Sequence, residues 1–180
     1  MRYKNVAKVL ISEEEIIKRT NVLAKQITED YKGEKLLLVC ILRGASLFFA
    51  DLVRKIDLDV NFDFMAVSSY GAGTSSSGEV RIIKDICEPV EGKNVILVED
   101  IIDSGNTLQY LVRLLKQRNP KSIKIAALLD KPERREVSIQ GDYIGFTIPN
   151  EFVVGYGLDY NEKYRNIPEV CVLKSEIYES

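Results

Sequence analysis

Apolar residues of this chain follow two patterns, continuous runs and spacing at the period of a helix. Continuous runs bounded by turn residues are typical of strands buried in a parallel sheet. They predict strands at residues 36–42, 60–69, 79–85, 94–99 and 122–129, and shorter strands near 143–147, 152–154 and 170–173. Helical spacing predicts a helix behind Ser12, where Glu15 completes a capping box, a second from Ser46 that carries Ile56, and a third at 108–118. This alternation predicts an α/β domain with a mainly parallel sheet flanked by helices.

Three of the predicted strands end in polar turns, which begin at Arg43, Asp100 and Asp130. Because parallel α/β sheets bind ligands at the carboxyl ends of their strands, we expect these turns to form one site. Residues 70–78 are rich in Gly, Ser and Thr and have no periodic apolar face. They predict a mobile loop that joins two strands into a hairpin.

The turn after residues 94–99 is the most informative of the three. Glu99, Asp100 and Asp103 place carboxylates close together, and Ser104-Gly105-Asn106-Thr107 then leads into a helix. Backbone N–H groups at a helix N-terminus favour an anion, whereas clustered carboxylates favour a cation or hydroxyl groups among them. A sugar phosphate with a divalent metal ion satisfies both. The plainer interpretations are a helix cap and a solvated acidic turn.

Composition narrows the possible chemistry. With 180 residues the chain suits one domain. It has no His, which excludes Ser-His-Asp and Cys-His catalysis and leaves acid–base chemistry to Asp, Glu, Lys, Tyr or Cys. A net charge of -2 is not typical of a nucleic-acid binder. No apolar run is long enough to span a membrane, and the N-terminus lacks the apolar core of a secretion signal. The widely separated Cys40, Cys87 and Cys171 fit a cytoplasmic location.

Five segments in order resemble the type I phosphoribosyltransferases, and within them the 6-oxopurine or hypoxanthine-guanine branch. One segment is the acidic turn, with the strand before it, at residues 95–108. The other four are Leu42-Arg43-Gly44-Ala45, Ser68-Ser69-Tyr70-Gly71, Asp130-Lys131-Pro132-Glu133-Arg134, and the stretch from Phe152 to Tyr160. The resemblance covers roughly residues 8–175. It implies the fold of that family, with a core at about 12–135 and a small hood subdomain formed by the N-terminal segment and about 136–180. It also implies a homodimer or homotetramer.

The resemblance implies a magnesium-dependent transfer of the 5-phosphoribosyl group from phosphoribosyl pyrophosphate to hypoxanthine or guanine, giving IMP or GMP and pyrophosphate. Glu99 and Asp100 would bind the ribose hydroxyls directly or through Mg²⁺. Asp103 would be the general base for the purine ring proton, unless it only caps the next helix. Ser104-Gly105-Asn106-Thr107 would hold the 5′-phosphate, with Asn106 contributing only its backbone N–H.

The same resemblance assigns the pyrophosphate contacts. Arg43, Gly44 and Arg165 would hold pyrophosphate, and in the family the peptide before the residue at Arg43 is often cis. Ser69 and Tyr70 would belong to a lid, formed with the loop to residue 78, that excludes water. The plainer interpretations are an Arg in solvent and a flexible surface hairpin.

The base contacts come from two later segments. Lys131 would donate to the 6-oxo group of the purine, because an ammonium offers donors only. Phe152 would stack on the purine, Val153 would line its edge, and Asp159 would reach a second Mg²⁺ through water, with its backbone near the 2-position of the base. A solvated Lys and an ordinary core Phe are the alternatives. Glu151 stands where some relatives carry Lys, so we assign no contact to its side chain.

Two other functions remain open from the sequence. A relative that prefers xanthine would differ around Val153 and the backbone of Asp159. A nucleotide-sensing regulator on the same fold would bind nucleic acid, but the chain has no added DNA-binding segment. We therefore predict a purine salvage enzyme without nucleic-acid or membrane partners.

Overall fold

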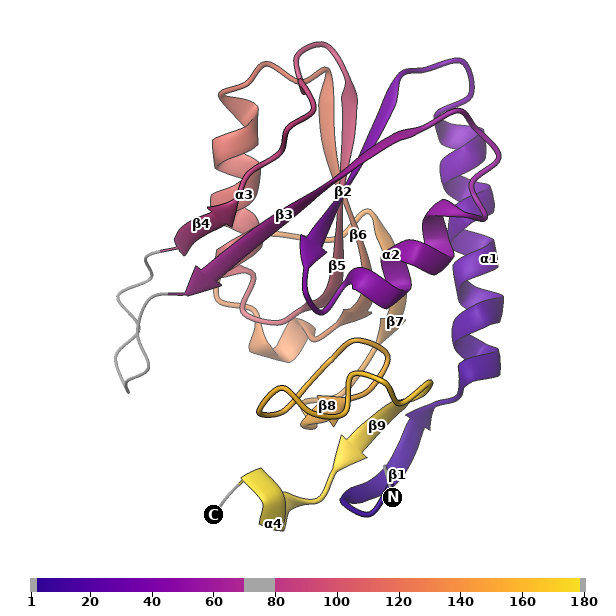
Figure 1. The fold of residues 1–180 in the computed structure, drawn as a ribbon, viewed down its shortest axis with the longest axis vertical. Coiled ribbons are helices and arrows are strands. Elements are labelled where there is room, and N and C mark those ends of the chain that lie inside the picture. Colours follow the sequence, from indigo (N-terminus) through magenta and orange to yellow (C-terminus); the bar gives the residue numbers. More distant parts are fainter. Residues whose placement is uncertain (1–2, 70–79, 179–180) are drawn as a thin grey trace.

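Two sheets organise the molecule (Figure 1). In this computed structural model, which describes residues 3–69 and 80–178, the larger sheet has the strand order β4-β3-β2-β5-β6-β7. Its strands are β2 (Leu36–Leu42), β3 (Asn61–Ser69), β4 (Val80–Lys84), β5 (Asn94–Ile102), β6 (Ser122–Asp130) and β7 (Tyr143–Thr147). Neighbouring strands are parallel except β4, which pairs antiparallel with β3. The predicted α/β class with a mainly parallel sheet is confirmed.

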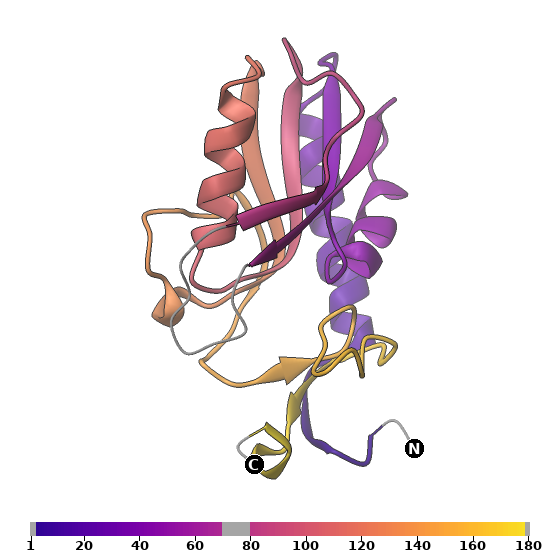
Figure 2. The same ribbon diagram turned by 60° about the vertical axis from the view of Figure 1, so that its left-hand side comes forward.

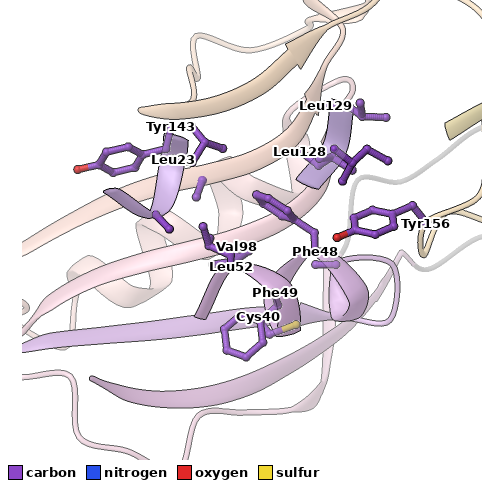
Figure 3. Packing of buried hydrophobic residues seen from close by; sticks show 14 of the residues in the cluster. Leu23, Cys40, Phe48, Phe49, Leu52, Val98, Leu128, Leu129, Tyr143 and Tyr156 are labelled. Carbon is purple, nitrogen blue, oxygen red and sulfur yellow. The ribbon is translucent and has the colours of Figure 1, made fainter. Parts of the chain in front are cut away.

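Helices cover both faces of this sheet (Figure 2). On one face α1 (Glu13–Asp30) and α2 (Ser46–Val53) bury their apolar side chains against Leu38, Cys40 and Val98. On the other, α3 (Asn106–Lys116) packs against the alternate strand positions, such as Val39 and Leu97. Strands buried on both sides explain the continuous apolar runs in the sequence. Figure 3 shows the first of these two clusters.

Element ends agree with the sequence where the local signal is strong. The capping box at α1 is present: the N–H of Glu15 donates to Ser12 Oγ at 3.3 Å, and the N–H of Ser12 donates to Glu15 Oε2 at 2.8 Å. Two expectations were wrong. Ile56 lies beyond the end of α2, and β5 continues past Glu99 to Ile102, so Asp100, which was expected to begin the turn, lies within the strand. The extension is stabilised by pairing with β6, which a local pattern does not reveal.

A small antiparallel sheet, which we call the hood sheet, lies at one end of the molecule (Figure 1). It consists of β1 (Val6–Ile11), β9 (Val170–Leu173) and β8 (Val153–Val154), and the short helix α4 (Ser175–Tyr178) follows it. The hood expected from about residue 136 onward begins later than that, because β7 pairs with β6 in the large sheet. Arg19 of α1 secures β7 there by donating to the carbonyls of Ile144 and Gly145.

No helix among the described residues is long and apolar enough to cross a membrane.

Candidate active site

The turns after β2, β5 and β6 meet at the carboxyl edge of the large sheet, and two cavities open there. The first has a volume of about 360 Å³, and the second, beside β8, about 420 Å³. Predicted residues that line the first are Arg43, Gly44, Glu99, Asp100, Asp103, Ser104, Gly105, Thr107, Asp159 and Arg165. Those that line the second are Asp103, Lys131, Phe152, Val153 and Asp159. Asp103 and Asp159 line both cavities, so the two cavities adjoin at these carboxylates.

The start of α3 is built around Gly105, which is its N-cap at φ 87°. A Cβ there would lie 2.6 Å from Ile139 Cγ2, so the position requires glycine for space as well as for its backbone angle. Gly105 has no side chain to cap the helix, but Ser104 Oγ accepts the backbone N–H of Asn106 at 3.4 Å, as in the plainer interpretation of a Ser cap. Gly105 and Thr107 line the first cavity, so the first turn of α3 places its backbone N–H groups beside that cavity. The Asn106 side chain instead donates to Glu136 Oε2 at 2.6 Å.

Arg135, which was not predicted from the sequence, stabilises this turn through hydrogen bonds to its backbone. The Arg135 guanidinium donates to the carbonyls of Asp103 (Nε, 3.0 Å), Ile102 and Ile139 and pairs with Asp130. Its side chain is only 15% exposed. The adjacent Arg134 is 52% exposed and places its Nε 3.1 Å from Asp103 Oδ1. The doubled arginine was visible in the sequence, but nothing in it indicated which side chain points inward.

Glu99, which is buried, and Asp100, which is half-buried, form an acidic pair near the end of β5. Glu99 is 9% exposed. Burial raises the pKa of Glu99 well above its ordinary range, and the charge of Asp100 raises it further. Burial likewise raises the pKa of Asp100, against the N–H of Ile101, which donates to it at 2.8 Å. The interpretation as a solvated acidic turn is therefore wrong, and the pair is suited to a cation or to hydroxyl donors.

These carboxylates fit Mg²⁺ as it binds in enzymes that act on phosphates. Such sites use one or two carboxylates and complete the coordination with substrate oxygens and water. Among the described residues there is no cluster of three or more His, Cys, Asp and Glu side chains that would enclose a metal ion by itself. A Cβ on Gly44 would lie 1.6 Å from Asp100 Oδ2, so the Arg43–Gly44 turn contacts the acidic pair directly.

Two arginines from distant parts of the chain face the first cavity, and each is ion-paired. Arg43 follows a cis peptide at Leu42 and pairs with Glu162 at 2.7 Å, although its side chain is 68% exposed. Arg165 pairs with Asp159 at 2.9 Å and donates to the Gly157 carbonyl at 2.7 Å. The segment from Gly157 to Arg165 thus closes over the turn at Arg43. Glu162 was not predicted, because only the tertiary structure brings it to Arg43.

The second cavity combines one buried cation with aromatic side chains. Lys131 is 8% exposed, so it is not a solvated Lys, and its Nζ donates to the Glu151 carbonyl at 2.6 Å. Burial lowers the pKa of Lys131 below its ordinary value, while Asp103 opposes this shift. Phe152 and Val153 form the hood side of the cavity. Arg134 and Tyr178, which the sequence analysis did not select, also line it.

The lid residues are only partly within the described structure. Ser69 is the last residue of β3. Tyr70 and the loop to residue 78 lie outside the described residues. The lid stays a prediction.

Comparison with known proteins identifies the family. The family model of the phosphoribosyl transferase domain matches residues 9–161. Over 178 residues, the chain is 54% identical to a hypoxanthine-guanine phosphoribosyltransferase of Streptococcus thermophilus, covering 99% of each chain. This chain belongs to the phosphoribosyltransferase family. The resemblance drawn from the five sequence segments is confirmed.

Solved phosphoribosyltransferases share the fold. A hypoxanthine phosphoribosyltransferase from Staphylococcus aureus superimposes with a TM-score of 0.95 at 47% identity, covering 99% of this chain and 97% of that one. A mutant of the Trypanosoma cruzi enzyme, solved as a ternary substrates complex, gives a TM-score of 0.92 at 44% identity, covering 98% of this chain and 100% of that one. Both cavities lie within the region common to these phosphoribosyltransferases.

Proposed function

We propose that this phosphoribosyltransferase transfers the 5-phosphoribosyl group from phosphoribosyl pyrophosphate to hypoxanthine or guanine, forming IMP or GMP and pyrophosphate. The observation that carries the proposal is the position of Asp103 between the two cavities. On one side are buried acids, two arginines and a helix N-terminus, and on the other are a buried lysine and an aromatic wall. The names of its relatives support the same activity.

The first cavity suits phosphoribosyl pyrophosphate. The N–H groups at the start of α3, with the hydroxyls of Ser104 and Thr107, would bind the 5′-phosphate. Glu99 and Asp100 would bind the ribose hydroxyls or Mg²⁺, and Asp159 would reach a second Mg²⁺ through water. When bound, Mg²⁺ would neutralise charge on the pyrophosphate.

The leaving pyrophosphate has its own set of contacts in the same cavity. The charges of Arg43 and Arg165 would hold it beside the Gly44 backbone. Both arginines are paired with carboxylates in the structure, so pyrophosphate would exchange with Glu162 and Asp159 as their partner.

The second cavity suits a 6-oxopurine. Lys131 uses one of its donors on the Glu151 carbonyl, which leaves donors for the 6-oxo group. The amino group of adenine offers no matching acceptor at that position, so adenine would leave this buried cation unsatisfied. Phe152 would stack on the ring, Val153 would line its edge, and the backbone at Asp159 would contact the 2-position.

Asp103 would act where the two substrates meet. As a purine imidazole nitrogen forms its bond to the anomeric carbon, the bond from that carbon to pyrophosphate breaks, and the purine loses a ring proton. The Asp103 carboxylate would accept this proton. General base assistance of this kind contributes about 10² to 10⁴ in rate. Its position between the cavities supports this role, because it reaches toward both the base and the sugar.

The test is pyrophosphate release from phosphoribosyl pyrophosphate and Mg²⁺ with hypoxanthine, guanine, xanthine, adenine or uracil. We expect turnover with hypoxanthine and guanine and none with adenine or uracil. A preference for xanthine would change the substrate assignment and direct attention to Val153. Absence of turnover with every base in folded protein would contradict the proposal. A homodimer or homotetramer and a cytoplasmic location stay predictions.

A further inference from the structure

An aromatic pair lies at the wall of the base cavity. The rings of Phe152 and Tyr178 are nearly parallel, with centroids 4.7 Å apart and an interplanar angle of 18°. Tyr160 meets Phe152 edge-on, at 5.6 Å and 89°. Stacked aromatic pairs stabilise each other beyond the area that they bury. Phe152 therefore has a specific partner in α4, a segment to which the proposed chemistry assigns no role.

The arrangement of elements indicates which side of Phe152 this partner supports. In both views α4 lies beyond the hood sheet, at the end of the molecule away from the large sheet (Figures 1 and 2). The cavity runs from Phe152 toward Ile101 of β5 and Lys131, which follows β6 in the large sheet. Tyr178 lines the cavity, but it belongs to α4, the element beyond the hood sheet. From this placement of α4 we infer that Tyr178 supports Phe152 from the hood side and leaves the side toward Ile101 for a ligand.

We propose that Tyr178 is a positioning residue for base recognition, which holds the Phe152 ring in the plane that stacks on the purine. The proposal rests on the proposed function, in which Phe152 is the stacking ring. A side chain that is already held in its bound orientation loses less freedom when the ligand binds, so affinity increases. Without Tyr178 the Phe152 ring would sample other orientations, and the base would bind only when the ring is correctly placed.

The test uses three variants of α4 and one of Phe152. Tyr178→Leu keeps apolar volume but removes the ring, and Tyr178→Phe keeps the ring. Ile177→Ala is the matched control, because Ile177 lies in the same helix and packs against the same buried residues, Val154, Ile167, Cys171 and Leu173. Phe152→Leu tests the stacking ring itself. For each protein, KM for hypoxanthine, KM for phosphoribosyl pyrophosphate, kcat and Tm are measured.

We expect Tyr178→Leu to raise KM for hypoxanthine roughly 3- to 10-fold, the factor that corresponds to one aromatic pair. KM for phosphoribosyl pyrophosphate and kcat should stay within about twofold, because the other cavity is unchanged. Tyr178→Phe and Ile177→Ala should resemble the native protein in all three constants. Phe152→Leu should raise KM for hypoxanthine at least as much as Tyr178→Leu.

Three results would overturn the proposal. KM for hypoxanthine unchanged in Tyr178→Leu would show that Phe152 needs no support. A lowered KM would show that Tyr178 occupies the place of the purine. An equal rise of both KM values with a lowered Tm would show a merely structural role. If Phe152→Leu also leaves the hypoxanthine KM unchanged, the error lies in the proposed base site. If Phe152→Leu raises it and Tyr178→Leu does not, only the role of Tyr178 is wrong.

Discussion

Arg135 donates from Nε to the backbone carbonyl of Asp103 at 3.0 Å, while the neighbouring Arg134 contacts the Asp103 carboxylate at 3.1 Å. Two consecutive arginines thus bind two different parts of one residue. Arg135 also pairs with Asp130 at the end of β6. Arg135 therefore links the turn at Asp103, the proposed general base, to the end of β6. The orientation of Asp103 depends on this connection, because Arg135 holds its backbone carbonyl.

Replacing Arg135 with Gln should destabilise the protein by about 3 to 5 kcal/mol, the cost of breaking a largely buried ion pair. The side chains of Arg135 and Asp130 are 15% and 19% exposed, so Asp130 would be left without its partner. KM for phosphoribosyl pyrophosphate should rise as well, because the turn loses its support. Urea denaturation followed by circular dichroism measures the first effect and steady-state kinetics the second.

Arg134→Gln provides the control, because it removes the same charge at the adjacent position. Arg134 is 52% exposed, and exposed ion pairs contribute roughly 0 to 1 kcal/mol. A loss of stability as large as that of Arg135→Gln would show that burial does not distinguish the two arginines.

Asp103→Asn should leave the fold and substrate affinity intact and reduce kcat by about 10² to 10⁴. The amide keeps the shape of the carboxylate but cannot accept the purine proton. Pre-steady-state measurement of product formation would separate this chemical step from product release. Native kcat in the variant would remove Asp103 from the proposed base role.

Lys131→Met should raise KM for hypoxanthine roughly 10- to 100-fold, the value of a hydrogen bond to a charged donor. Discrimination against adenine should also weaken, since the donor that disfavours an amino group is gone. Lys8→Met is the matched control, because Lys8 contacts the Glu151 side chain at 2.8 Å while Lys131 contacts its carbonyl at 2.6 Å. An equal loss in both variants would assign the effect to Glu151 rather than to the base.

Asp63, which lines neither cavity, should make the free energy of unfolding depend on pH. Burial opposes its charge, but N–H groups of Glu88, Phe64 and Cys87, with Lys84, outweigh this and lower the pKa of Asp63 to about 2 from its ordinary 3.8. Because the folded pKa is the lower one, the stabilisation is complete above about pH 4 and is lost as pH falls toward 2.

The size of this effect follows from the shift. It corresponds to about 2 kcal/mol, and comparison of urea unfolding of the native protein and Asp63→Asn isolates it from other carboxylates. The difference between the two proteins should be largest near neutral pH and shrink below pH 4. A difference that stays constant from pH 6 to pH 2.5 would contradict the assignment.

Much of the fold could be predicted because burial leaves a local pattern in the sequence. β2, β7 and β9 have the bounds that the sequence predicted, and the capping box at Ser12 and Glu15 lies at the start of α1. The acidic turn with its adjoining Ser104-Gly105 also marked the site. These signals depend on neighbours within a few residues, so the sequence by itself determined the elements and the chemical character of the turns between them.

Only the tertiary structure decided which side chains meet. Glu162 pairs with Arg43 from 119 residues away, Arg135 rather than Arg134 points inward, and Tyr178 stacks on Phe152. The continuation of β5 past Glu99 to Ile102 also depends on pairing with β6. Such contacts depend on how sheets and turns pack, and the periodicity of a segment carries no information on what lies opposite it. The sequence determined which groups were available, and packing determined their partners, their burial and hence the electrostatics of the site.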